Sequence, residues 1–285
     1  MTPPAQLHIL LAQKGRQALV IRHGTAKSVC TLLWDRKDDT FALGQWMRGS
    51  IRKSMCDLSP DGEHFLYSAS KSTMDGRIGW TVVSRTPYLK ALAYYPRRYG
   101  GGWFLNKKEY CIPFGTPDPK DLEHPEVRRV DAEQPPSLYA ARLAGNGWTI
   151  DDTKPKPSFL RSAGHGWTLR LQSTGRYQLT NGNQTVDTRK WDWADLDGKR
   201  LVYTIKGVLW AATVAPSGIE QPKLLHDFNG MKFEAIAAPY ASGQPAKQLR
   251  PNVTPALAAK PAFARKRKPL PKKPNRSRVR PDDEA

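Results

Sequence analysis

Cysteine is scarce in this chain of 285 residues. The three cysteines, Cys30, Cys56 and Cys111, lie far apart in apolar stretches, and no CxxC pair occurs. A cysteine zinc site or a dithiol redox site needs paired cysteines at such spacing. Free cysteine is among the residue types that are most often buried. We therefore expect three buried free thiols and no metal site.

Long hydrophobic runs are also missing. The first apolar run, Leu7–Ala12, is shorter than the core of a secretory signal and follows no basic segment. No stretch approaches the roughly 20 apolar residues that a membrane helix needs. We therefore expect a cytoplasmic protein without a membrane span.

Acidic residues are few relative to basic ones. The chain has 26 Asp and Glu against 45 Lys and Arg, which gives a formal net charge of +19. Residues 247–285 hold twelve of the basic residues and only three of the acids, so about half of the excess lies near the end of the chain. This distribution predicts a folded domain over residues 1–240 and a basic tail over residues 241–285.

The tail is rich in proline as well as in positive charge, and it has almost no apolar mass. Proline prevents a continuous helix, and like charges extend a chain, so we predict a disordered segment. Each cation of such a segment can displace counterions from a polyanion such as a nucleic acid. The predicted polyanion contacts are Arg265, Lys266, Arg267, Lys268, Lys272, Lys273, Arg276, Arg278 and Arg280. An acidic protein or an acidic membrane surface is an alternative partner, and a solubilising tail without a partner is another reading.

Short apolar runs with frequent turns dominate the first 240 residues. Nine Trp and ten Tyr suit β-sheets, where aromatic rings pack on a pleated surface. In CDLSPDGEHFLY (Cys56–Tyr67), Pro60 and Gly62 favour a turn between two strands. The turn at Asp197-Gly198 lies in a predicted three-stranded meander, Trp193–Val214. Further predicted strands are Gln17–Arg22, Ser28–Asp35, Thr40–Met47, Arg77–Arg85 and Tyr88–Tyr95.

Two stretches, DLSPDGEHFLY and WADLDGKRLVY, share Asp-Gly, a polar pair and an aliphatic–aliphatic–Tyr strand. Such hairpins resemble the inner strand pair of TolB-like and WD-repeat β-propeller blades, as found in bacterial propeller-like proteins. The resemblance implies an all-β fold with a single β-propeller-like domain of about five or six blades. The blades would span residues 15–48, 49–96, 97–152, 153–190 and 191–228, and the strand Met231–Ala238 would close the ring beside the N-terminal strand. Two smaller barrels or sandwiches, divided near Gly115–Pro136, are the alternative fold.

Two other parts of the domain carry local signals. The proline- and acid-rich stretch Gly115–Pro136 predicts a surface loop. Arg142–Ile150 and Arg161–Leu169 match in R-x-A-G-x-G-W-T, and we interpret them as two related strand entries.

One tripeptide suggests chemistry. Arg22-His23-Gly24 is similar to the Arg-His-Gly signature of histidine phosphatases, in which the His accepts the phosphate and the Arg binds it. His165 would then be the second His of the site. That family needs a parallel sheet with crossover helices, whereas the residues after Gly24 predict antiparallel hairpins. We therefore interpret the tripeptide as the end of a surface strand.

The remaining candidates are explained by turns. Asp192, Asp195 and Asp197 are similar to part of a calcium loop, but the loop's first and last ligands are missing. Gly100-Gly101-Gly102 precedes a strand rather than a helix that would bind a phosphate. We expect no catalytic residue, no metal and no cofactor.

These observations favour a non-enzymatic binding or scaffold module that presents a propeller surface to a protein partner and binds a polyanion through its tail. An RNA- or DNA-binding accessory protein is the alternative hypothesis. A histidine-phosphatase-like enzyme at Arg22-His23-Gly24 is a minor alternative.

Overall fold

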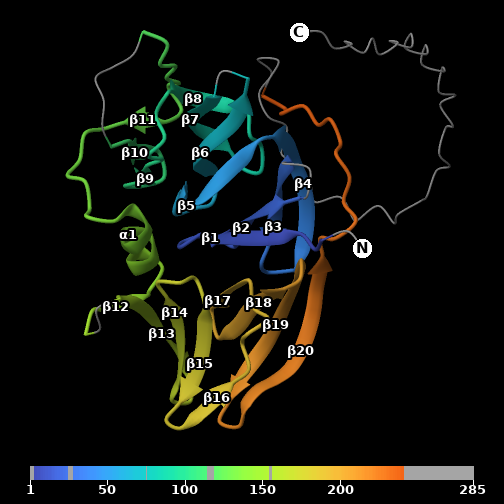
Figure 1. Cartoon of the computed structure of the whole chain (residues 1–285). Helices are drawn as coiled ribbons and strands as arrows, with labels where there is room; N and C mark the ends of the chain where they lie inside the picture. Colours follow the sequence, from blue (N-terminus) through green and yellow to red (C-terminus); the bar gives the residue numbers. More distant parts are fainter. Residues whose placement is uncertain (1–2, 25–27, 75, 114–118, 154–155, 241–285) are drawn as a thin grey trace, which may run out of the picture. The chain divides into compact units, whose positions relative to one another are not determined.

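The structure is a computed structural model, and it describes residues 3–24, 28–74, 76–113, 119–153 and 156–240. These residues form β1–β20 and the helix α1, and the strands group into five sheets (Figure 1). The prediction of an all-β fold is confirmed. Residues 241–285 lie outside the described residues, and the tail residues predicted to contact a polyanion lie there with them.

Each sheet is formed by strands that follow one another in the sequence. Sheet one contains β1 (Gln6–Leu11), β2 (Gln17–His23), β3 (Ser28–Asp35) and β4 (Thr40–Arg48). Sheet two contains β5 (Ser50–Leu58), β6 (His64–Thr73), β7 (Gly76–Arg85) and β8 (Ala91–Pro96). Sheet three contains β9 (Trp103–Phe104), β10 (Glu109–Cys111) and β11 (Arg128–Arg129).

The helix α1 (Leu138–Gly145) precedes the last two sheets. Sheet four contains β12 (Thr149–Asp151), β13 (Ser158–Gly164), β14 (Trp167–Gln172), β15 (Tyr177–Asn181) and β16 (Gln184–Val186). Sheet five contains β17 (Trp193–Asp197), β18 (Arg200–Ile205), β19 (Val208–Ala215) and β20 (Gly218–Asp227). All strand pairs are antiparallel except β10 and β11, so hairpins account for almost the whole fold.

The turn between β5 and β6 has the conformation that its residues predict. Ser59 Oγ donates to Asp61 Oδ1 at 2.7 Å and accepts the backbone N–H of His64 at 2.9 Å. Gly62 has a φ of 85°, which a side chain would disfavour. Pro60 O also accepts the backbone N–H of Lys14 at 2.7 Å. This turn therefore fixes both its own hairpin and the neighbouring β1–β2 turn.

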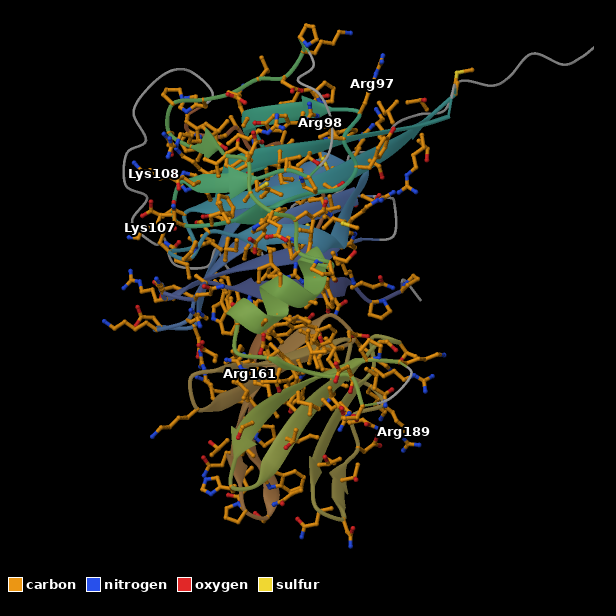
Figure 2. All side chains as sticks on the ribbon, turned by 90° about the vertical axis from the view of Figure 1, so that its left-hand side faces the viewer. Arg97, Arg98, Lys107, Lys108, Arg161 and Arg189 are labelled. Atoms are coloured by element: carbon orange, nitrogen blue, oxygen red, sulfur yellow. The ribbon has the colours of Figure 1, made fainter. Side chains whose placement is uncertain are left out.

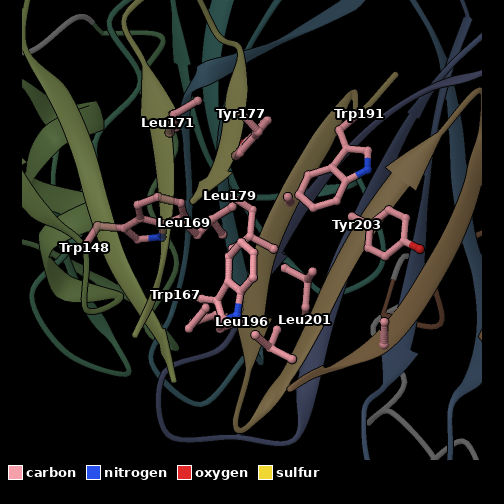
Figure 3. Close-up of a cluster of buried hydrophobic side chains, with 14 of the residues drawn as sticks. Trp148, Trp167, Leu169, Leu171, Tyr177, Leu179, Trp191, Leu196, Leu201 and Tyr203 are labelled. Atoms are coloured by element: carbon pink, nitrogen blue, oxygen red, sulfur yellow. The ribbon is translucent and has the colours of Figure 1, made fainter. Parts of the chain in front are cut away.

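The sheets bury their faces against one another. Sheets four and five share a cluster that contains Trp148, Trp167, Leu179, Leu201 and Tyr203 (Figure 3). Sheet one shares a second cluster with sheet five and a third with sheet two. Sheets two and three share a fourth cluster. Apolar burial therefore links the sheets in the order four, five, one, two, three, with the first and last sheets of the sequence in contact.

A charged clasp joins sheet one to sheet five. Arg200 donates from Nη1 and Nη2 to the two carboxylate oxygens of Asp39, at 2.9 and 2.8 Å, and from Nε to Asp197 Oδ2 at 2.9 Å. Arg36 Nη1 donates to the other Asp197 oxygen at 2.6 Å. The Arg200 guanidinium also lies over the Trp34 ring, 5.6 Å from its centroid. Four charges from the β3–β4 and β17–β18 turns thus hold the two sheets together.

The first predicted blade is wrong at its beginning. It was expected to start at Gly15, but β1 precedes that residue and pairs with β2 along its whole length. Five of the six residues of β1 are buried. A strand that is buried on both faces has no polar alternation, and this explains why the apolar run Leu7–Ala12 did not identify it.

The segment Arg142–Ile150 was predicted to lead into a strand, but it begins in a helix, because α1 includes Arg142. Leu, Ala and Arg favour a helix here, and the Ser137 hydroxyl accepts the Ala140 N–H at 3.2 Å as the N-cap. The matching segment Arg161–Leu169 does form a hairpin, with left-handed backbone at 164–166. The shared motif therefore specifies only the glycine turn that leads to a buried Trp.

The predicted closing strand Met231–Ala238 is also wrong, since these residues form no strand. They lie beside β4, the last strand of sheet one, where Gln45 Nε2 donates to Ile236 O at 2.7 Å. The rings of Phe233 and Trp46 are 6.0 Å apart. Side-chain contacts replace the expected ladder of backbone hydrogen bonds. The described part of Gly115–Pro136 is mostly loop, as predicted, and includes only the short strand β11.

The expected state of the cysteines is confirmed. Cys30, Cys56 and Cys111 are free and buried. Trp34, Trp148 and Trp167 are buried in the clusters between sheets, and Trp46, Trp80 and Trp210 pack against these clusters while partly exposed. No helix in the described part of the chain has the length and apolarity to cross a bilayer.

We predict that Arg200→Gln lowers the free energy of unfolding by about 1.5 kcal/mol, the usual cost of losing hydrogen bonds to a charged partner. The substitution leaves the half-buried carboxylates of Asp39 and Asp197 with fewer donors. Urea denaturation measures the change. The matched control is Arg189→Gln, because the Arg189 side chain is 89% exposed and, within the described part of the chain, its ion pair is with Asp187, two residues earlier. Equal stability of the two variants would contradict the role of the clasp.

Candidate functional site

Polar and charged side chains gather where the first strands of several sheets meet. Strand β1 contacts both β5 and β17, and α1 contacts β5. His8 comes from β1, Lys53 and Asp57 from β5, Arg142 from α1 and Asp195 from β17. We call these five residues the first-strand junction. They bring buried and half-buried polar groups from four elements close together.

A bulge in β5 explains why Arg142 is buried. The pairing of β5 with β6 is interrupted between Ile51 and Cys56, so carbonyl groups in this stretch leave the ladder. Arg142 Nη1 donates to Lys53 O at 3.3 Å and also to Cys56 O. Its side chain is only 9% exposed. The helix therefore supplies the donor that the bulge requires.

The histidines of β1 and β2 are kept neutral by their surroundings. His8 is buried, and its Nε2 has no hydrogen-bond partner among the residues that the structure describes. Burial holds the pKa of His8 well below its ordinary value, and the nearby charges of Arg142 and Lys53 lower it further. Burial, with a smaller contribution from Lys53, lowers the pKa of His23 to about 4. Neither imidazole ring is positively charged at neutral pH.

The carboxylates of the junction shift in the opposite direction. Burial raises the pKa of Asp57 to about 6, although its Oδ2 accepts the Phe104 N–H at 2.7 Å. Burial also raises the pKa of Asp195, against the opposing effect of its partner Arg161. Burial therefore favours the neutral forms of both acids, although Asp57, with a pKa of about 6, is still mostly ionised at neutral pH.

The space inside the junction is small. A cavity of about 20 Å³ lies between β1, α1, β15 and β17. His8, Arg142, Asn146, Tyr177 and Asp195 contribute to its lining. This volume holds about one water molecule. The arrangement offers polar groups to a single small occupant and has no room for an organic substrate.

A wider, open groove of about 580 Å³ lies beside the β9–β10 turn. Its acids are engaged: Glu109 pairs with Arg128, and Glu126 pairs with Arg85. Lys107 and Lys108 supply its exposed charge (Figure 2), and Lys107 Nζ lies 3.9 Å from Asp61 Oδ2. The groove is therefore a weakly basic surface.

The residues of the phosphatase hypothesis, Arg22, His23 and His165, have different surroundings in the structure. Arg22 Nε donates to Phe228 O at 2.7 Å, and its guanidinium lies 5.5 Å from the centroid of the Trp46 ring. Strand β2, which ends at His23, is antiparallel to both of its neighbours. His165 is exposed in the turn between β13 and β14. The predicted surface strand end is corrected in one respect, because Arg22 is buried.

The predicted acidic turn residues also have individual roles. Asp192 Oδ2 accepts the Lys206 N–H at 2.9 Å, Asp195 pairs with Arg161, and Asp197 belongs to the clasp. Among the residues that the structure describes, no group of three or more His, Cys, Asp or Glu is placed to hold a metal ion. Gly100-Gly101-Gly102 leads into β9, as predicted.

Sequence reasoning missed the first-strand junction. Arg142 lay in a segment that was interpreted as a strand, and the β5 bulge has no recognisable signal in RKSM. The sequence offers one indication of a buried polar site here, because His8 interrupts an otherwise apolar run.

We predict that acid destabilises the protein through His23. Its folded pKa of about 4 lies below the ordinary value of 6.5, so its contribution to stability is complete above pH 6.5 and is lost as the pH falls toward 4. Between pH 7 and pH 5 the loss is about 2 kcal/mol. His23→Asn should reduce the loss measured by urea denaturation by about this amount.

Asp57 has the opposite sign, because its pKa of about 6 is raised above the ordinary value of 3.8, and it stabilises the fold as the pH falls below 6. Because Asp57 is present in both the parent chain and His23→Asn, its contribution cancels when the two are compared. The control is His165→Asn, at the exposed turn, which should retain the full acid sensitivity. An unchanged loss of stability in His23→Asn would contradict the assignment.

Comparison with known proteins adds no family. No protein-family model matches the chain, and a search of the curated proteins found no similar sequence. The likeness to TolB-like and WD-repeat blades therefore rests on the two Asp-Gly hairpins and on the succession of antiparallel sheets. What the protein does has to be argued from its own residues.

Proposed function

We propose that this protein is a non-enzymatic binding module, in which a propeller-like domain presents its surface to a protein partner and the basic tail binds a polyanion. The observation that carries the proposal is a difference between the acidic side chains, many of which form ion pairs, and the basic side chains, many of which are exposed. Many acids of the described residues are engaged in ion pairs, including Asp39, Asp121, Asp151 and Asp195. By contrast, many Lys and Arg side chains are exposed, so the surface that a partner meets is basic.

Several exposed cations have no ion pair within the described residues. They include Lys14, Lys37, Lys108 and Lys199, each in a turn at the end of a strand. The tail adds a formal net charge of +9 over residues 247–285. A concentration of positive charge on both the domain and the tail favours association with a polyanion.

The propeller-like arrangement is part of the proposal. Five sheets of consecutive strands favour five blades, and the contacts of β1 with β5 and β17, and of β5 with β9, suit inner strands around a common axis. Stacked blades bury both faces of each sheet and leave the connecting turns free for a partner. A rigid platform of this kind suits a scaffold role, although fold alone does not determine function.

The absence of an enzymatic role is likewise proposed. It is supported by the engagement of Arg22 with Phe228 and Trp46, which leaves its guanidinium unavailable to a phosphate. It is also supported by the small volume of the first-strand junction. The phosphatase alternative predicts that His23→Ala abolishes hydrolysis of p-nitrophenyl phosphate by the purified protein. Our proposal predicts no hydrolysis in either form.

We predict that the tail dominates the salt dependence of polyanion binding. The variant replaces Arg265, Lys266, Arg267, Lys268, Lys272, Lys273, Arg276, Arg278 and Arg280 by Gln in the full chain. For single-stranded RNA, the slope of log K against log salt should fall by roughly 0.7 for each contact removed. Fluorescence anisotropy with labelled poly-U and with labelled heparin measures the slope.

The matched control replaces exposed domain cations, Lys14, Lys37, Lys108 and Lys199, by Gln. It should reduce the slope less than the tail variant does. An affinity and a slope that are unchanged in the tail variant would contradict the proposed role of the tail. A strong preference for one RNA sequence would instead favour the alternative of a nucleic-acid-binding accessory protein.

A further inference from the structure

Strands β6 and β7 extend beyond the other strands of sheet two. The pairing of β5 with β6 begins at Ser50 and Ser70, and the pairing of β7 with β8 ends at Trp80 and Pro96. Past these points Lys71 pairs only with Ile78, Ser72 with Arg77 and Thr73 with Gly76. We call residues 71–74 and 76–78 the β6–β7 ribbon. A two-stranded ribbon gains little stability by itself, so its projection from the sheet calls for a reason.

The ribbon carries apolar side chains that no part of the described chain covers. Met74 is fully exposed, and Ile78 is 51% exposed. Tyr99, which follows β8, is 38% exposed, and its hydroxyl donates to Arg77 O at 3.4 Å. A cluster of large exposed apolar groups on one projection is typical of an interaction surface.

The same surface is positively charged. Lys71, Arg77 and Arg97 are exposed on the ribbon and on the residues that follow β8. The Arg97 N–H donates to Gly79 O at 3.0 Å, beside the ribbon, and its side chain points away from the protein (Figure 2). The sequence places one acid, Asp75, in the connecting turn, outside the described residues. Cations beside exposed apolar side chains suit the boundary between lipid headgroups and acyl chains.

We propose that the β6–β7 ribbon docks this protein on the surface of an anionic lipid bilayer, with Met74 and Ile78 entering the boundary between headgroups and acyl chains. The inference rests on the proposed function, because it identifies the polyanion of the basic tail as a lipid surface. Stable attachment to a membrane surface generally needs two weak signals, such as an apolar anchor and a polybasic segment. The ribbon provides the first signal and residues 260–281 provide the second.

Two other classes of macromolecule fit the ribbon less well. A stable protein interface buries about 800 Å² on each partner, far more than the tip of one hairpin presents. Single-stranded nucleic acid binds by stacking successive bases on several aromatic rings, and this surface offers the single ring of Tyr99 beside the aliphatic Met74 and Ile78. A bilayer can accept a small apolar tip because lipids rearrange around it.

The test uses the full chain with Met74→Cys labelled by an environment-sensitive fluorophore. Cys30, Cys56 and Cys111 are buried, so the label is directed to position 74. Vesicles of phosphatidylcholine and phosphatidylglycerol should shift the emission to the blue, whereas vesicles of phosphatidylcholine alone should not. In unlabelled protein, Met74→Ser combined with Ile78→Ser should lower the vesicle partition coefficient by at least about tenfold, since two apolar contacts are lost.

The control carries the label at Lys199→Cys, in the exposed β17–β18 turn, and should show no shift. If the chain binds anionic vesicles while the label at position 74 stays in water, the tail alone is responsible and the ribbon inference is overturned. In that outcome the proposed polyanion-binding function stands. If the chain binds heparin but no vesicle, the ribbon inference also fails. Failure to bind either would overturn the proposed function as well.

Discussion

Apolar burial between neighbouring sheets is the constraint on which the whole structure depends. A single antiparallel sheet of this size cannot cover its own faces, so each sheet needs a neighbour. Sheet one is covered by sheet five on one side and by sheet two on the other. The beginning and the end of the folded chain are thereby brought together, and the clasp of Arg36, Asp39, Asp197 and Arg200 adds charge pairing to this contact.

This packing also determines where the charges lie. Acids and basic residues near the contacts between sheets pair with one another. In the first-strand junction, His8, Arg142 and Asp195 line a cavity that holds about one water. The remaining cations are left on turns and on the projecting ribbon. The basic exterior is the observation from which we propose a binding module.

Local sequence signals predicted the hairpins well because each depends on a few neighbouring residues. The Ser59–Gly62 turn and the Trp193–Val214 meander are examples, since turn residues and strand alternation suffice to specify them. The bounds of β3 were predicted to the residue. Strand β1 was missed because burial on both faces removes alternation, and α1 was missed because its glycine turn matched one that joins two strands.

The candidate site was harder to predict because it depends on contacts between distant residues. Arg142 donates hydrogen bonds to carbonyl groups that the β5 bulge, more than 80 residues earlier, releases from the strand ladder. Arg22 was identified from a short motif, but its partner Phe228 lies 206 residues away. Neither of these long-range contacts produces a local sequence pattern from which it could be predicted. The exposed ribbon has a similar origin, because its projection depends on where β5 and β8 stop pairing.

A double-mutant cycle between Asp39→Asn and Arg200→Gln tests the contact of the first and last sheets most directly. The two residues are 161 positions apart, so they interact only if these sheets pack against each other. The stacked arrangement predicts a coupling free energy of about 1 kcal/mol from urea denaturation of the parent chain, the two single variants and the double variant. Strictly additive effects of the two substitutions would contradict it.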